Sequence, residues 1–138
     1  MNINFRNILA IIIGVIIGAL VNMGLVSLGP NLIPPPDGVD MTHMDSLKES
    51  ILLLEPKNFI FPFLAHAIGT LVGAFVAVKL AKSMHMMCAL VVGLVFLAGG
   101  IMMVRMVGGP TWFIITDLVL AYIPMAYLGK IMANKTPS

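Results

Sequence analysis

Four long apolar runs constrain this chain more than any other feature. They cover residues 7–28, 59–80, 86–107 and 112–131. A helix needs about 20 mostly apolar residues to cross a bilayer. Irregular backbone facing lipid would leave its amides without hydrogen-bond partners, so a helix is the only viable structure for such runs. The sequence therefore predicts four transmembrane helices.

The composition agrees with a membrane protein. Hydrophobic residues make up 59% of the 138 positions and charged residues 10%, whereas soluble domains carry about 25% charged residues. A globule of this size could not bury so much apolar surface. The length gives room for one membrane domain over residues 1–138 and no second domain. A single cysteine, Cys88, excludes an intramolecular disulfide.

Lysine and arginine are distributed unevenly around the four runs. The basic residues flanking the expected inner ends are Arg6, Lys79, Lys82, Lys130 and Lys135. Segment 29–58, between the first two runs, instead contains five of the six acidic residues. Because short cytoplasmic loops are enriched in Lys and Arg, both termini are expected in the cytoplasm and segment 29–58 outside.

The outer segment 29–58 is predicted to contain one short helix. Ser46 followed by Glu49 has the spacing of a capping box, and Pro56 ends the run that follows. We therefore expect an amphipathic helix over residues 46–55 at the membrane surface. It could cover the outer end of the bundle or act as a gating lid.

Glycines recur at four-residue spacing in the first two runs. The pairs are Gly14 and Gly18 in the first run, and Gly69 and Gly73 in the second. Lipid supplies no hydrophobic drive between helices, so helices in membranes associate where small residues let their backbones approach. In antiparallel helices, Gly18 should lie level with Gly69, and Gly14 level with Gly73.

The fourth run contains an interior proline, Pro124. Proline has no backbone N–H, so the carbonyl of Leu120 loses its intrahelical donor and the helix should bend. A change of shape is a simpler explanation for this proline than a hinge. Trp112, at the start of the same run, is typical of an aromatic anchor at the outer interface.

Each predicted helix carries one polar residue at a similar depth. The four are Asn22, His66, Arg105 and Asp117. At 1.5 Å per residue, three of them fall about 10 Å below the outer surface, and Arg105 lies about one turn nearer to it. Because an unpaired charge in hydrocarbon costs several kcal/mol, we expect Arg105 to pair with Asp117. His66 or Asn22 would add hydrogen bonds, and Thr70, Thr116 and Tyr122 are close enough in sequence to join.

Two interpretations of this polar cluster remain open. His66 and Asp117 could belong to a proton or ion path, or to a pocket for a small ligand that enters from outside. The cluster could instead be a satisfied polar lock that fixes the register of the helices. The inner halves of the runs show no continuing chain of polar residues, so a complete path through one copy is not visible.

A group of sulfur and imidazole side chains lies at the inner end of the third run. It comprises Met84, His85, Met86 and Cys88. Thioether, thiol and imidazole ligands suit Cu(I), which makes these residues weak candidates for a copper site. Methionine is also an ordinary apolar filler, and no methionine ladder crosses the bilayer.

Sequence motifs of enzymes and cofactor sites are not apparent. There is no catalytic triad pattern, no glycine-rich phosphate loop and no His-x-x-x-His pair. We therefore expect no cofactor and lean against an enzyme, although His66 and Asp117 could do acid–base chemistry with a partner. The formal net charge of +2 gives no reason to expect nucleic acid as a partner.

Three segments resemble those of a group of small bacterial four-span membrane proteins of unassigned function. They are residues 61–75 (starting Phe-Pro-Phe-Leu-Ala-His-Ala), 110–126 (Pro-Thr-Trp-Phe-Ile-Ile-Thr-Asp) and 32–40 (Leu-Ile-Pro-Pro-Pro-Asp-Gly-Val-Asp). The resemblance implies a multi-pass protein of a bacterial inner membrane, so that segment 29–58 would be periplasmic. It implies no catalytic or ligand-binding residues.

The sequence as a whole predicts an all-α transmembrane four-helix bundle with a short periplasmic amphipathic helix. Its partners would be the lipid bilayer and either further copies of the chain or a larger membrane complex. The first functional hypothesis is a small membrane-interaction or accessory subunit. The second is a small transporter or channel component that uses the polar cluster, and the third is a Cu(I) handler.

Overall fold

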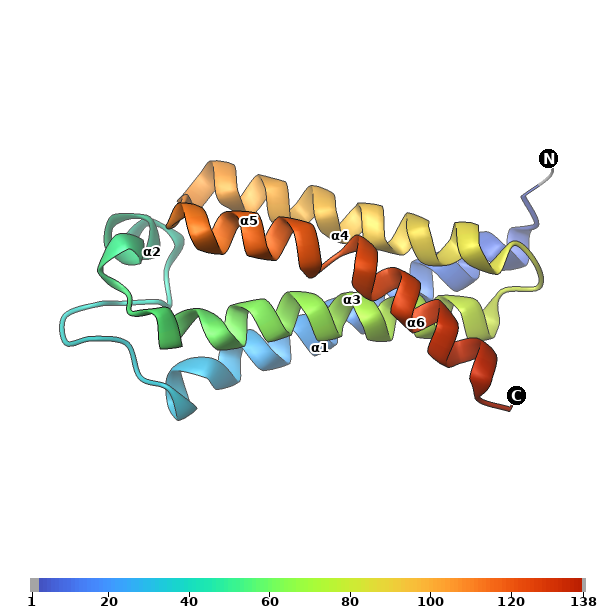
Figure 1. Ribbon diagram of the computed structural model, residues 1–138, viewed down its shortest axis with the longest axis horizontal. Helices are drawn as coiled ribbons and strands as arrows, with labels where there is room; N and C mark the ends of the chain where they lie inside the picture. The colour runs from blue at the N-terminus through green and yellow to red at the C-terminus, as the bar shows by residue number, and fades with distance from the viewer. Residues whose placement is uncertain (1–2, 138) are drawn as a thin grey trace.

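All four apolar runs are helical in the computed structural model, which describes residues 3–137 (Figure 1). The long helices are α1 (Phe5–Leu32), α3 (Ile60–Leu80) and α4 (His85–Val107), and the fourth run consists of α5 (Thr111–Leu120) and α6 (Ile123–Lys135). Each run is long and apolar enough to cross a membrane. The prediction of an all-α bundle with four candidate spans is confirmed.

Helix α1 continues about one turn beyond its predicted end. Pro30 lies inside the helix, which ends at Leu32. The preceding Gly29 is buried, and a methyl group on it would lie 2.8 Å from Cβ of Phe61 in α3. We infer that this contact with α3 keeps the last turn helical where the Gly-Pro pair alone suggested an end.

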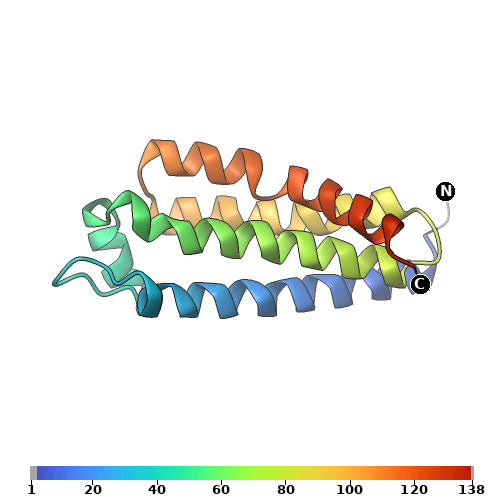
Figure 2. The same ribbon diagram turned by 60° about the horizontal axis from the view of Figure 1, so that its bottom comes forward.

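Helices α1 and α3 form the most extensive contact in the bundle and run side by side in opposite directions (Figure 2). A methyl group on Gly18 would lie 2.6 Å from the carbonyl oxygen of Gly69, and one on Gly73 would lie 2.8 Å from that of Gly14. The structure thus brings the glycines together at the two levels expected from the sequence. The backbones are in direct contact there, which only glycine permits.

The fourth span is broken rather than bent. Tyr122 separates α5 from α6 with backbone angles of φ −114° and ψ −78°, and Pro124 follows in the first turn of α6, where a missing N–H costs little. Helix α6 starts afresh with the amide of Ala126 donating to the carbonyl of Tyr122 at 2.8 Å. The break places the ring of Tyr122 against Gly100 of α4, where a methyl group would lie 2.7 Å from Cζ.

The end of the bundle where both termini lie, called the inner end, is closely packed (Figure 1). Its core consists largely of alanine and valine, among them Ala77, Ala89 and Val92. Asn7 of α1 is fully buried there. Its Oδ1 accepts hydrogen bonds from the amide N atoms of Lys82, at 3.0 Å, and Ser83, at 3.3 Å. This side chain, which the sequence analysis missed, fixes the α3–α4 turn to α1.

The outer segment contains α2 (Met44–Ser50) and two short 3₁₀ helices, η1 (Ile51–Leu53) and η2 (Pro56–Phe59). The predicted helix over 46–55 is therefore partly wrong. The observed helix α2 begins at Met44, ends at Ser50 and has no side-chain cap at its start.

The capping box lies at Glu55 and Asn58 rather than at Ser46 and Glu49. The amide Nδ2 of Asn58 also donates to the carbonyl of Pro34 at 3.1 Å. Asn58 is buried, and its side chain ties the start of the second span to the proline-rich segment of the loop. We infer that this anchorage favours the capping box at Glu55.

Candidate functional site

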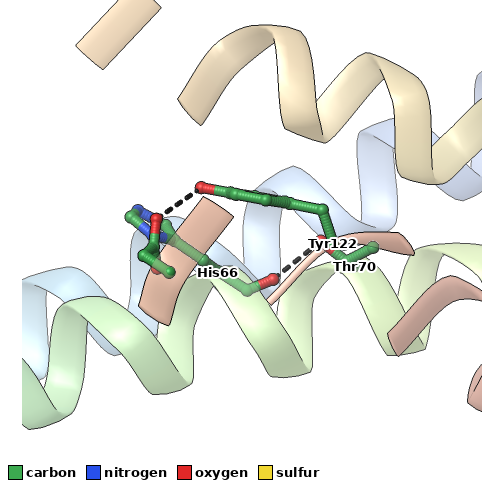
Figure 3. Close-up of polar contacts among 4 residues, drawn as sticks. His66, Thr70 and Tyr122 are labelled. Carbon is green, nitrogen blue, oxygen red and sulfur yellow. Dashed lines mark hydrogen bonds and ion pairs between the residues drawn. The ribbon is translucent and has the colours of Figure 1, made fainter. Parts of the chain in front are cut away.

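Three side chains from the second and fourth spans meet in the outer half of the bundle. Nδ1 of His66, on α3, lies 2.8 Å from Oδ1 of Asp117, on α5. The hydroxyl of Tyr122, from the break, donates to Oδ2 of Asp117 at 3.0 Å. The rings of His66 and Tyr122 are stacked, with their centroids 5.7 Å apart, and Figure 3 shows the hydroxyl end of Tyr122 pointing toward the His66 side chain. These three residues form the His66–Asp117–Tyr122 triangle.

The contacts of the triangle are compatible with one tautomer of His66 in particular. The oxygens of an aspartate carboxylate only accept hydrogen bonds, and the hydroxyl of Tyr122 already donates to one of them in Asp117. With Asp117 as a carboxylate, Nδ1 of His66 is the donor to the other oxygen. Its other nitrogen, Nε2, has no hydrogen-bond partner among residues 3–137, and it can accept or, when the ring is charged, donate one hydrogen bond.

Thr70 supports His66 but does not join the triangle. Its hydroxyl donates to the carbonyl of His66 at 2.7 Å, within the same helix, and Figure 3 shows this bond beside the ring contacts. Thr70 is fully buried, and this bond within its own helix satisfies its hydroxyl.

The predicted pairing of Arg105 with Asp117 is wrong. Both carboxylate oxygens of Asp117 are occupied by His66 and Tyr122. Arg105 is exposed, and no ion pair to it is found among residues 3–137. The cause is rotation about the helix axis, because the neighbouring Val104 faces the bundle and successive residues of a helix point in different directions. Near a membrane surface, a long basic side chain can reach the polar interface.

Asn22, the remaining polar residue, lies beside a different neighbour. Its Cβ would be 3.1 Å from a methyl group on Gly69, so it packs where α1 approaches α3. Its Oδ1 is buried and has no hydrogen-bond partner among residues 3–137. The structure therefore brings together two of the four predicted residues, His66 and Asp117, and adds Tyr122.

A cavity of about 150 Å³ lies directly outside the triangle. Its walls come from all four spans, and Leu47, Ile51 and Leu54 of the outer segment cover it. His66 and Asp117 are the only polar side chains in the lining, which contains no Lys or Arg. The arrangement is an apolar chamber with one hydrogen-bonding corner.

The sulfur-rich inner end of α4 packs against its neighbours through Cys88, which lies in a buried cluster with Ala10 and Ala81. Cys88 is buried, and its Sγ lies 3.9 Å from the carbonyl oxygen of Ser83. Residues 3–137 contain no group of three or more His, Cys, Asp or Glu side chains that could hold a metal ion. Thioether ligation of Cu(I) by Met84 and Met86, with His85, stays a prediction.

Comparisons of the chain with protein-family models, with curated proteins and with solved structures give no match. The case for a function rests on the geometry of the cavity and of the triangle. Of the residues that build it, Tyr122 is the hardest to select from sequence, because its position depends on the helix break. The interior proline two residues later, Pro124, signals a distortion of the helix but does not select this side chain.

Proposed function

We propose that this protein binds a small, largely apolar molecule in the outer cavity, with one polar group of the molecule held by Nε2 of His66. The observation that carries the proposal is the cavity itself. Ligand sites are typically apolar chambers with few, well-placed polar groups, and the lining described above has this character.

The size and charge of the cavity narrow the class of ligand. Its volume of about 150 Å³ is below the roughly 300–1,000 Å³ of pockets for drug-sized ligands. It therefore suits a small molecule or the head of a larger one. Asp117 is the acidic group of the lining, and no Lys or Arg accompanies it. An uncharged polar group fits this environment better than a phosphate or carboxylate.

A purely structural role for the triangle, as a polar lock, accounts for fewer of its features than ligand binding does. A lock needs Asp117 satisfied, which His66 and Tyr122 achieve. It does not need an apolar chamber that His66 helps to line, or a ring nitrogen of His66 without a partner among residues 3–137. A conduction path is less favoured too, because the small side chains of the inner half, such as Ala77 and Ala89, are closely packed and fully buried. An accessory role in a larger membrane complex stays a prediction and is compatible with ligand binding.

We propose further that the protein lies in the inner membrane of a bacterium with both termini in the cytoplasm. Both ends of the chain lie at the same end of the bundle (Figure 1). Basic side chains gather there: Arg6 donates to the carbonyl of Leu80, and Lys79 contacts the carbonyls of Thr136 and Pro137. Enrichment of Lys and Arg on the cytoplasmic side supports this orientation. The cavity would then open toward the periplasmic half of the bilayer.

Reporter fusions test the orientation. A reporter placed after Lys135 should report a cytoplasmic location, and one inserted near Asp40 a periplasmic location. The opposite result at either position would overturn the topology.

A matched pair of variants tests ligand binding. Val104 lines the cavity, whereas Val95 lies on the exposed face of the same helix. The wild type, Val104→Phe and Val95→Phe would be purified in mild detergent and extracted with organic solvent for mass spectrometry. A small molecule should be retained by the wild type and by Val95→Phe and lost from Val104→Phe. If both variants retain the same molecules as the wild type, the cavity is not the binding site.

A further inference from the structure

An open groove of about 210 Å³ lies between α3 and α5, beside the cavity. Its walls include Ile60 and Leu64 from α3, and Trp112 and Thr116 from α5. Ile60 is 47% exposed and Trp112 is 50% exposed. Because these helices are candidate membrane spans, we infer that the groove faces the hydrocarbon of the bilayer. The Thr116 hydroxyl donates to the carbonyl of Trp112 at 2.7 Å, so it adds no free polar group.

The groove and the cavity share two lining residues, Phe59 and Phe113. Their rings are in contact, with centroids 4.6 Å apart and planes inclined by 41°. Trp112 meets Phe59 edge-on at 5.5 Å. The two spaces therefore adjoin at a wall built from aromatic side chains, and a ligand that occupies both would have to displace the buried ring of Phe59 or the ring of Phe113.

We propose that the groove holds the apolar tail of a membrane-soluble ligand whose uncharged, oxygen-bearing head occupies the cavity. This inference rests on the function proposed above and specifies its ligand. The head passes between Phe59 and Phe113 from the lipid, and the tail remains in the groove. The small volume of the cavity agrees with a head alone, and the adjoining groove supplies the space for the rest of the molecule.

The chemistry of the head follows from the triangle. In the tautomer with the proton on Nδ1, which faces Asp117, the neutral ring presents a lone pair on Nε2. A hydroxyl group donates to this lone pair, and a carbonyl oxygen accepts from Nε2 when the ring is protonated. A phosphate or carboxylate head would enter a chamber that holds an acidic residue and no Lys or Arg, and the charge of a protonated His66 ring would already be paired with Asp117. The ligand is therefore a lipid with an uncharged head.

Phenol and 4-octylphenol are suitable probes, because they share a head and differ in the tail. Binding to the protein in nanodiscs can be measured through thermal stability, since a ligand that binds the folded state raises it with concentration. Both probes should stabilise the wild type, and octanoate, with its anionic head, should not.

Variants of the groove separate the head from the tail. Leu64→Trp fills the groove, and Leu94→Trp makes the same change at a lipid-exposed site of α4. Leu64→Trp should lower the affinity for 4-octylphenol by about tenfold or more, equivalent to about 1.4 kcal/mol, and leave that for phenol unchanged. Leu94→Trp should change neither. Thr116→Phe, an exposed position on the other wall, provides a second block should Leu64→Trp not fold.

The outcomes keep the two proposals apart. If phenol stabilises the protein and the groove variants bind 4-octylphenol as tightly as the wild type, the tail does not use the groove, and only this inference fails. If neither probe stabilises the wild type, or if octanoate binds as well as 4-octylphenol, the assigned head chemistry is wrong. The retained-molecule experiment with Val104→Phe then decides separately whether the cavity binds a ligand at all.

Discussion

The inner and outer halves of the bundle are built from the same helices but pack in different ways. In the inner half, alanine and glycine bring the backbones together, as at Ala77 and Gly73. In the outer half, large side chains such as Phe59 and Met103 surround a cavity instead of filling it. The change coincides with the break at Tyr122. We infer that the tight half holds the fold together and allows the other half to enclose a cavity.

Polar groups differ between the halves in the same sense. At the inner end, Asn7 bonds to the backbone of the α3–α4 turn, and its Nδ2 also donates to the hydroxyl of Ser83. In the outer half, the side chains of His66 and Asp117 bond to each other, and Nε2 of His66 has no hydrogen-bond partner among residues 3–137. Polar groups that only stabilise a fold are normally satisfied internally. The unused hydrogen-bonding capacity at His66 is the feature on which the proposed ligand binding depends.

The largest expected effect comes from disrupting the tight half. Gly73→Leu places a side chain where the carbonyl of Gly14 and the side chain of Val92 already lie. Overpacking costs about 1–3 kcal/mol where side chains can shift. Here a backbone would have to move, so we expect a loss above about 3 kcal/mol or failure to fold, measured as thermal stability in detergent.

Two other glycines serve as controls for this change. Gly24 and Gly99 have no atom within 4 Å of an added methyl group, so Gly24→Leu and Gly99→Leu should have little effect on thermal stability. If Gly73→Leu is as stable as these controls, the contrast between a tight and a roomy half is wrong.

A smaller effect is expected from weakening the triangle. Asp117→Asn removes the charge that accepts hydrogen bonds from His66 and Tyr122. Hydrogen bonds to charged groups are worth about 1.5–3 kcal/mol, so a loss of this size is expected in stability. Tyr122→Phe removes one of these bonds and should cost less than Asp117→Asn. Equal stability of Asp117→Asn and the wild type would mean that the triangle does not stabilise the fold.

The position of a residue along its helix axis was easier to predict than the direction in which its side chain points around that axis. Hydropathy along the chain located the spans, and the residue spacing within them gave the levels of Gly14 and Gly73. It does not specify rotation about the axis, and Arg105 was therefore assigned to the interior although it faces outward. Tyr122 enters the site only because Pro124 breaks the helix. The outer helix begins at Met44 rather than at the predicted Ser46. The loop around it is also held by contacts between residues far apart in the sequence, such as Asn58 with Pro34, which local sequence patterns do not reveal.

The smallest expected effect concerns Arg105, whose predicted pairing the structure replaces. An exposed residue outside any special contact changes stability by about 0.5 kcal/mol or less when substituted, so Arg105→Gln should fold as stably as the wild type. The double variant with Asp117→Asn decides between the two pairings. Independent sites add to within about 0.3–0.5 kcal/mol, so the double variant should lose only what Asp117→Asn loses. Had Arg105 and Asp117 formed a buried pair, each single change would be costly and the double change would recover much of the loss. A recovery of that kind would return Arg105 to the interior, and it would give the cavity the basic group that an anionic ligand needs.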